Sequence, residues 1–261
     1  METIEVSVQD ERYVLGAAVM LYSKVSNGYH QNETGAIATV HHVHDVDGKP
    51  VIGAGRPMLE ADYLAMVNVL SPQQRPQIEW QDRSILAKGM GKIIWWTPPM
   101  SRAMFFKKSD MFGASTFTGQ GICPVPGMVW MSDGRDLFVY AYRGTAMPDK
   151  ETKLCQAPLF NVWARGEVCV GSATRPDDSE KGNPKAWERF LFDSHFTHPN
   201  FAESDRLTKG VKPAEFWKKM VAKPTKKFPE SVLVDLELKV ADLLEPDFRT
   251  HVNKMRATGE F

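Results

Sequence analysis

The sequence has little cysteine, no excess of either charge and no long apolar run, and each absence excludes a class of protein. Only three of the 261 residues are cysteine, namely Cys123, Cys155 and Cys169. A secreted disulfide scaffold needs more thiols in an even number, so we expect these three to be reduced. Lys plus Arg and Asp plus Glu number 32 each. No whole-protein field therefore favours DNA, an anionic membrane or a cationic substrate, and any such preference has to come from a local patch.

Targeting and membrane signals are also missing. No uncharged apolar run approaches the ~18 residues that cross a bilayer. The N-terminus METIEVSVQDER lacks the basic-then-apolar pattern of a signal peptide. We therefore predict a cytoplasmic protein without a membrane partner. The hydrophobic content of 43% is ample for a core, in one large domain or two small ones.

The first part of the chain is rich in strand patterns. An apolar, β-branched run over residues 36–44 precedes an Asp-Gly turn at 45–48, which predicts a hairpin. Apolar residues at three-to-four spacing predict a helix over 59–70. Residues 85–106 are rich in Ile and aromatics and contain Pro98-Pro99. Because proline interrupts a strand, we expect two strands there around a rigid corner.

The middle of the chain contains a second hairpin. Small residues with interspersed Gly and Pro predict a loop over 113–127. Two apolar segments, 128–131 and 136–142, flank the turn sequence Ser-Asp-Gly-Arg at 132–135, a strong antiparallel hairpin pattern. Residues 147–160 (MPDKETKLCQAPLF) then read as an extended, proline-bearing crossover.

Further helices are expected after the last cysteine. Asn183 as cap and Pro184 at the first helical position predict the start of an amphipathic helix. A second helix is expected over 214–221, a half-buried strand over 233–240 and a last helix over 246–255.

The most informative segment is Asn161-Val162-Trp163-Ala164-Arg165-Gly166-Glu167-Val168-Cys169-Val170. It sets a cysteine eight positions after an asparagine and three after a glycine. If the chain folds back here, a thiol and a side-chain amide share one small space. A thiolate can hold an acyl group as a thioester, and an amide N–H can stabilise the oxyanion that forms when a nucleophile attacks it.

The order of hairpin, crossover, Asn-containing loop, Gly-x-Val-Cys and amphipathic helix resembles the ubiquitin-conjugating enzyme superfamily. In that superfamily a His-Pro-Asn triplet precedes the thioester cysteine, and the Asn of the triplet lies eight residues before that cysteine. Asn161, Gly166, Val168 and Cys169 match this pattern without a gap. The segments WWTPPMSRAMFF, APLFNVWARGEVCVG and FLFDSHFTH further resemble the bacterial PRTRC system protein B family, which is family D of the prokaryotic branch. This resemblance is best over residues 85–200.

The resemblance implies a function and a set of partners. Cys169 would carry the C-terminal acyl group of a ubiquitin-like protein as a thioester, and Asn161 would stabilise the tetrahedral intermediate. The expected partners are the ubiquitin-like protein, a ThiF-type activating enzyme and a ParB-like protein, encoded together in plasmid or mobile-element cassettes. No cofactor and no metal are expected.

Two departures from the superfamily pattern matter. Leu159 and Phe160 stand where the superfamily has His and Pro, so the histidine that normally braces the asparagine loop is absent. A His-Pro-Asn triplet does occur at 198–200, but it follows the cysteine, and we interpret it as a helix-terminating turn.

Several alternatives stay open. Cys169 between two valines is also the pattern of a core thiol, and Asn161 the pattern of a turn residue that binds nearby backbone. His42 and His44 share a strand face without a third metal ligand in useful spacing. The lysines from 209 to 227 alternate with Phe216 and Trp217, which is compatible with single-stranded nucleic acid or an acidic partner, although a solvated helix face is the default.

The sequence thus predicts an α+β protein with two parts. Residues 1–84 form a strand-rich N-terminal α+β extension. Residues 85–261 form a ubiquitin-conjugating-like domain, an antiparallel β-meander with flanking helices and a C-terminal extension. The function hypothesis is a thioester-forming carrier or transferase. The alternatives are a binding module of the same fold without the chemistry, and a nucleic-acid-associated plasmid-maintenance factor.

Overall fold

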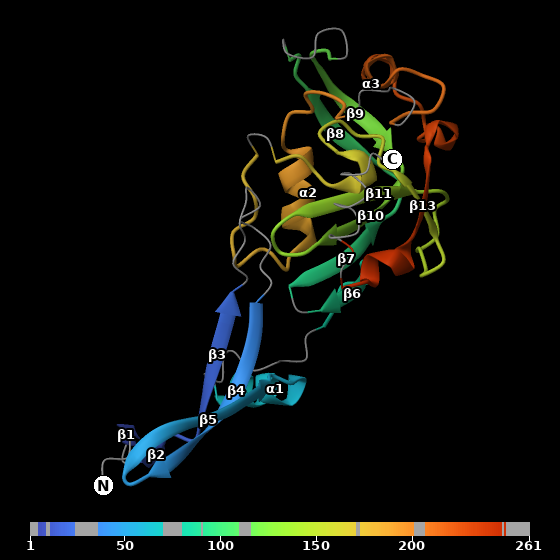
Figure 1. The fold of residues 1–261 in the computed structure, drawn as a ribbon. Helices are drawn as coiled ribbons and strands as arrows, with labels where there is room; N and C mark the ends of the chain where they lie inside the picture. Colours follow the sequence, from blue (N-terminus) through green and yellow to red (C-terminus); the bar gives the residue numbers. More distant parts are fainter. Residues whose placement is uncertain are drawn as a thin grey trace. The chain divides into compact units, whose positions relative to one another are not determined.

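The computed structural model describes residues 5–8, 11–23, 36–69, 80–89, 91–109, 116–170, 173–200, 207–246 and 248. The chain divides into two compact units, Met1–Trp80 and Gln81–Phe261, and each is described by itself (Figure 1). The predicted boundary after residue 84 stays a prediction. Within the described residues no helix is long and apolar enough to cross a bilayer.

The first unit is built from antiparallel strands and one helix. β1 (Glu5–Val8) pairs with β2 (Glu11–Val14), and β3 (Ala17–Ser23), β4 (Ala36–Val46) and β5 (Lys49–Pro57) form a sheet in that order. The predicted hairpin is confirmed, with strands longer than expected. Its turn places Asp47 at φ 54° and Gly48 at φ 80°, the left-handed conformations that a tight two-residue hairpin turn needs. The predicted helix is α1 (Glu60–Val69).

The second unit is organised around a six-stranded antiparallel sheet of order β13-β12-β11-β10-β7-β6. Its strands are β6 (Ile85–Gly89), β7 (Lys92–Thr97), β10 (Gly127–Ser132), β11 (Leu137–Tyr142), β12 (Lys153–Gln156) and β13 (Asp235–Lys239). A separate two-stranded ribbon pairs β8 (Met100–Phe106) with β9 (Gly119–Val125). The β10–β11 hairpin matches the Ser-Asp-Gly-Arg pattern, and β13 is the predicted C-terminal strand in shorter form.

Three expectations about the strands need correction. Residues 85–106 contain three strands rather than two, because a turn at Gly91 (φ 69°) separates β6 from β7; the break at Pro98-Pro99 is confirmed. The predicted loop over 113–127 contains β9, whose glycines fit a close neighbour. A Cβ added at Gly121 would lie 3.3 Å from the Val221 carbonyl oxygen of α3 (Pro213–Ala222). The crossover is not wholly extended either, since a turn closed by the Thr152 backbone N–H and the Asp149 carbonyl oxygen at 3.2 Å precedes β12, the strand that pairs with β11.

Both faces of the large sheet are buried. Alternate residues of β7 and β10 contribute to two cores, with Trp95 and Trp130 in one and Ile94 and Val129 in the other. The rings of Trp95 and Trp130 stack with centroids 5.9 Å apart. The first core is completed by α2 (Pro184–Phe192) and α3, and the second by the 3-10 helix η6 (Val240–Leu244) and Phe248.

The helix after the cysteine begins as the sequence predicts. The Asn183 side chain accepts a hydrogen bond from the Lys185 backbone N–H at 3.1 Å, and Pro184 is the first helical residue. Glu188 is a charged residue of this amphipathic helix that is nevertheless buried, with 9% of it exposed. It forms an ion pair with Arg102 and accepts a hydrogen bond from Trp95 Nε1 at 3.3 Å. The predicted last helix over 246–255 lies almost entirely outside the described residues.

Candidate functional site

The segment from Asn161 to Cys169 folds back on itself. Val162 and Val168 form an antiparallel bridge, and the Cys169 backbone N–H donates to the Asn161 carbonyl oxygen at 2.7 Å. Asn161 takes a left-handed conformation (φ 61°), which asparagine tolerates better than most residues. The spacing of eight residues therefore sets Asn161 and Cys169 opposite each other on the backbone.

Gly166 is the residue that lets this loop close on strand β11. Its φ is 92°, and an added Cβ would lie 2.6 Å from Cε1 and Cζ of Tyr140 and 2.8 Å from the Val139 carbonyl oxygen. No side chain fits such space without movement of the neighbours. The Tyr140 hydroxyl also donates to the Arg165 carbonyl oxygen at 2.6 Å. The glycine of the motif thus has a steric role in the placement of the cysteine.

The three cysteines differ in their access to solvent. Cys123 and Cys155 are both 0% exposed, whereas Cys169 is only partly buried. Burial raises the pKa of the Cys123 thiol and raises that of Cys155 to about 12. Because the thiolate is the nucleophilic form, Cys123 and Cys155 are unsuited to acyl transfer. Cys169 is thus the one cysteine of the three that is not fully buried.

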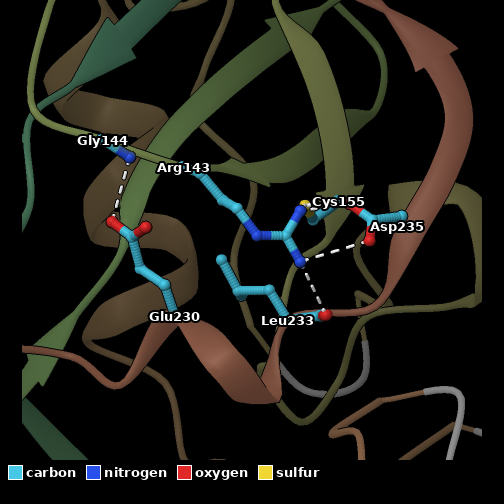
Figure 2. Close-up of polar contacts among 6 residues, drawn as sticks. All are labelled: Arg143, Gly144, Cys155, Glu230, Leu233 and Asp235. Carbon is cyan, nitrogen blue, oxygen red and sulfur yellow. Dashed lines mark hydrogen bonds and ion pairs between the residues drawn. The ribbon is translucent and has the colours of Figure 1, made fainter.

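Cys155 belongs instead to a network that joins β11, β12 and β13 (Figure 2). Arg143 donates to the Cys155 sulfur at 3.2 Å and to the Leu233 carbonyl oxygen at 3.1 Å, and it forms an ion pair with Asp235. The Arg143 guanidinium holds the pKa of the Asp235 carboxyl below its usual range. Glu230 accepts from the Gly144 backbone N–H at 2.9 Å. These contacts tie the C-terminal strand to the sheet and assign Cys155 a structural role.

The Asn161 carboxamide is directed at the segment that follows α2. Its Nδ2 donates to the His195 carbonyl oxygen at 2.7 Å, and its Oδ1 accepts from both the backbone N–H and the hydroxyl of Thr197, each at 3.0 Å. The Asn161 backbone N–H donates to the His198 carbonyl oxygen at 3.0 Å. The side chain is therefore a brace between two loops. The second Nδ2 hydrogen is not used by any other described residue.

The ring of His198 extends this brace. The Thr197 hydroxyl lies 2.9 Å from His198 Nδ1 and gives its single hydrogen to Asn161 Oδ1. The hydroxyl oxygen must then accept from His198, so the ring carries its proton on Nδ1. Burial lowers the pKa of His198, which favours this neutral form. Sequence reasoning missed Thr197, since only the fold brings it to Asn161.

The His-Pro-Asn triplet at 198–200 is not the helix-terminating turn that we expected. Helix α2 ends at Phe192, and Phe196 then forms a bridge with Phe106, which carries the triplet onto the Asn161 loop. Leu159 and Phe160, in the superfamily's His-Pro positions, are both 0% exposed. The Phe160 ring packs edge-on against Phe106 at 5.6 Å. Apolar packing before Asn161 and hydrogen bonds after α2 thus replace the missing histidine.

A cavity of about 570 Å³ lies beside this brace, between residues 173–180 and one side of α2. It includes His195, whose carbonyl Asn161 holds. Both of its arginines are paired, Arg189 with Glu180 of the same lining and Arg175 with Asp136 outside it. With charges of both signs, the cavity identifies no single class of ligand.

The other candidate residues are not brought together into sites. Among the described residues no group of three or more His, Cys, Asp or Glu side chains could hold a metal ion, and His42 and His44 gain no third ligand. Phe216 and Trp217 are 7% and 0% exposed, and Trp217 Nε1 donates to the Pro158 carbonyl oxygen at 2.7 Å. These aromatics are therefore not free to stack on bases between the lysines, which removes the support they gave to the single-stranded nucleic-acid alternative.

A comparison with protein families adds to this geometry. Residues 62–236 match Prokaryotic E2 family D, E2 being the ubiquitin-conjugating class, and this is more than half of the chain. The chain belongs to the prokaryotic E2 family D. Neither the curated proteins nor the solved structures that were searched gave a match. The matched residues include the Asn161–Cys169 loop, α2 and the strands β6, β7, β10, β11 and β12 of the large sheet, and the family implies partners of a ubiquitin-like pathway at most.

Proposed function

We propose that this prokaryotic E2 family D protein is a thioester-forming carrier for a ubiquitin-like protein, with Cys169 as the nucleophile. The observation that carries the proposal is the difference among its three thiols. Cys123 and Cys155 are fully buried, whereas Cys169 reaches solvent on a loop whose fold-back sets it opposite Asn161. A core thiol would not need the strained, glycine-dependent loop that presents Cys169.

The proposed step is an acyl transfer between sulfur atoms or from an acyl phosphate. The Cys169 thiolate attacks the C-terminal carbonyl of the ubiquitin-like protein, which an activating enzyme holds as an adenylate or as a thioester. The new C–S bond forms as the bond to AMP or to the activator sulfur breaks. The leaving group takes the electron pair, and the proton lost from Cys169 passes to solvent or to the departing thiolate. A later attack by an amine forms an amide and returns the thiol.

Asn161 is proposed to act in this transfer mainly as a positioning residue. Three side-chain hydrogen bonds join it to residues 195–197, and its carbonyl oxygen holds the Cys169 backbone N–H. The remaining Nδ2 hydrogen is the group that an oxyanion would use. In other enzymes, loss of a single oxyanion donor raises the activation free energy by about 2.7–4 kcal/mol. A role of Asn161 as oxyanion donor therefore predicts a rate loss of that size on its replacement, and a role in positioning alone does not.

The finer assignment, to a PRTRC cassette, rests on the resemblance of three segments. On that basis the proposed partners are a ThiF-type activating enzyme, a ubiquitin-like protein and a ParB-like protein. The rival function is a binding module that keeps the fold without the chemistry. The absence of His at Leu159 favours it, as does the 42% exposure of Trp163 on the same loop, because an exposed tryptophan is a common anchor for a protein partner.

The test mixes the purified chain with the candidate activator, the ubiquitin-like protein and ATP, and measures intact mass with and without reductant. We expect a reductant-sensitive adduct that becomes a reductant-resistant ester in Cys169→Ser. Cys123→Ala and Cys155→Ala are matched controls that should keep the sensitive adduct, once circular dichroism shows that they fold. An adduct that persists unchanged in Cys169→Ser would show that Cys169 is not the nucleophile, and partner binding without any adduct would establish the binding module instead.

A further inference from the structure

Seven exposed lysines gather along α3 and the segments that flank it. They are Lys209, Lys212, Lys218, Lys219, Lys223, Lys226 and Lys227, and we call them the lysine surface. The same stretch, residues 209–227, contains one acidic residue, Glu215. Its formal charge is therefore seven minus one, or +6, in a chain whose total charge is zero.

The fold of α3 explains why the charges face solvent. Phe216, Trp217 and Met220 are buried against the first core, and the helix packs beside β9 (Figure 1). The opposite side of the helix presents Lys218 and Lys219. Because the helix is anchored by buried aromatics, the lysines are held on a fixed support rather than on a loose tail.

Few of these charges are neutralised by neighbours. Of the seven lysines only Lys212 forms an ion pair with another described residue, Glu215, at 4.0 Å. The pKa of the Asp235 carboxyl is lowered mainly by its hydrogen bond with Arg143 and least by the charge of Lys209, which shows that Lys209 has a carboxylate nearby. Lys218, Lys219, Lys223, Lys226 and Lys227 have no carboxylate partner among the described residues. Five like charges close together favour a polyanionic ligand.

The chemistry around the lysines points to phosphate rather than to a protein face. No large apolar side chain between residues 207 and 230 is exposed, whereas protein interfaces are rich in aromatic anchors and poor in lysine. The buried aromatics leave nothing to stack on bases. Residues 207–227 also contain no arginine, the residue that recognises guanine with two parallel hydrogen bonds. Lysine alone contacts phosphates as a point charge.

We infer that the lysine surface binds the phosphate backbone of nucleic acid without regard to sequence. This activity is separate from the proposed thioester chemistry, since it uses α3 and its flanks rather than the Asn161–Cys169 loop. Each lysine that neutralises a phosphate releases condensed counterions, so affinity should fall steeply with salt. Five unpaired lysines set the steepest slope of log K against log salt at about −4.5, or about 500-fold in affinity for each fourfold rise in salt.

The test is fluorescence anisotropy of the full chain with a labelled random-sequence DNA duplex over a salt series. The triple variant Lys218→Gln, Lys219→Gln, Lys223→Gln should bind on the order of 100-fold more weakly and lose about 3 from the slope. The same three positions changed to Arg should keep the affinity and the slope. A matched control with equal charge change, Lys49→Gln, Lys150→Gln, Lys153→Gln, uses exposed lysines elsewhere and should bind like the parent.

Three outcomes would overturn the inference. The first is no salt-dependent binding by the parent chain, and the second is a triple variant, shown by thermal unfolding to be folded, that binds with unchanged slope. The third is competition by polyglutamate as strong as that by unlabelled duplex, which would assign the surface to an acidic protein. Cys169→Ser should bind the duplex normally, so failure of the thioester proposal and failure of this one are separable.

Discussion

The three thiols should react in the native protein at very different rates, and this can be measured without any partner. The pKa of about 12 at Cys155 leaves about one thiolate in ten thousand at about pH 8, against about one in four for an unperturbed thiol of pKa ~8.5. Cys155 should therefore react on the order of 10³-fold more slowly than a free thiol. Its 0% exposure slows it further, since a reagent can reach it only after local opening.

The assay titrates the native chain with an aromatic disulfide and then repeats the titration in denaturant. We expect one fast thiol in the native state and all three after unfolding. Peptide mapping should place the fast label on Cys169, and Cys169→Ser should remove the fast phase. The reasoning is refuted if Cys123 or Cys155 takes the label first, or if Cys169 stays unlabelled until the protein unfolds.

Three more predictions concern the loop around the cysteine. Gly166→Ala should lower the free energy of unfolding by about 2–4 kcal/mol in urea denaturation. The control is Gly144→Ala, at φ 95° with open space around it, which should lower it by only about 1 kcal/mol. Equal losses in the two variants would contradict the steric role of Gly166. Thr197→Val should cost about 1–2 kcal/mol and slow adduct formation, because Asn161 loses a donor, and Thr197→Ser should restore both. His198 has a lowered pKa, so the unfolded chain takes up its proton first and stability should fall as pH drops below ~6.5. His198→Gln should flatten that fall in thermal-unfolding scans, and an unchanged pH profile would contradict this.

Much of the local structure could be predicted from sequence because its determinants are local. The Asp-Gly turn at 45–48 and the cap at Asn183 with Pro184 act within a few residues, and both hairpin and helix are found there. Strand β9 could not be predicted, because its glycines read as loop signals. Their reason is tertiary, since Gly121 makes room for the α3 backbone at Val221.

The candidate site divides in the same way. The spacing of Asn161 and Cys169 predicted that they come together if the chain folds back, and the Val162–Val168 bridge is that fold-back. The contacts that fix the Asn161 carboxamide come from His195 and Thr197, over thirty positions later. No local pattern marks them. A weak signal was the His-Pro-Asn triplet at 198–200, which we interpreted as a helix-terminating turn.

Asn161 is held on one side by the apolar packing of Leu159 and Phe160 and on the other by hydrogen bonds, and this difference decides which side of the loop can move. Leu159 and Phe160 are locked in the core, so the start of the loop cannot shift without a loss of packing, which costs several kcal/mol for residues of this size. The other half of the brace consists of hydrogen bonds from Asn161 to Thr197 and His195, which are individually worth about 0.5–1.5 kcal/mol. Movement of the loop, as the proposed acyl transfer would need, is therefore cheapest on the side of residues 195–198. If Asn161 turns toward an oxyanion, it should do so by release of those contacts while its backbone stays fixed opposite Cys169.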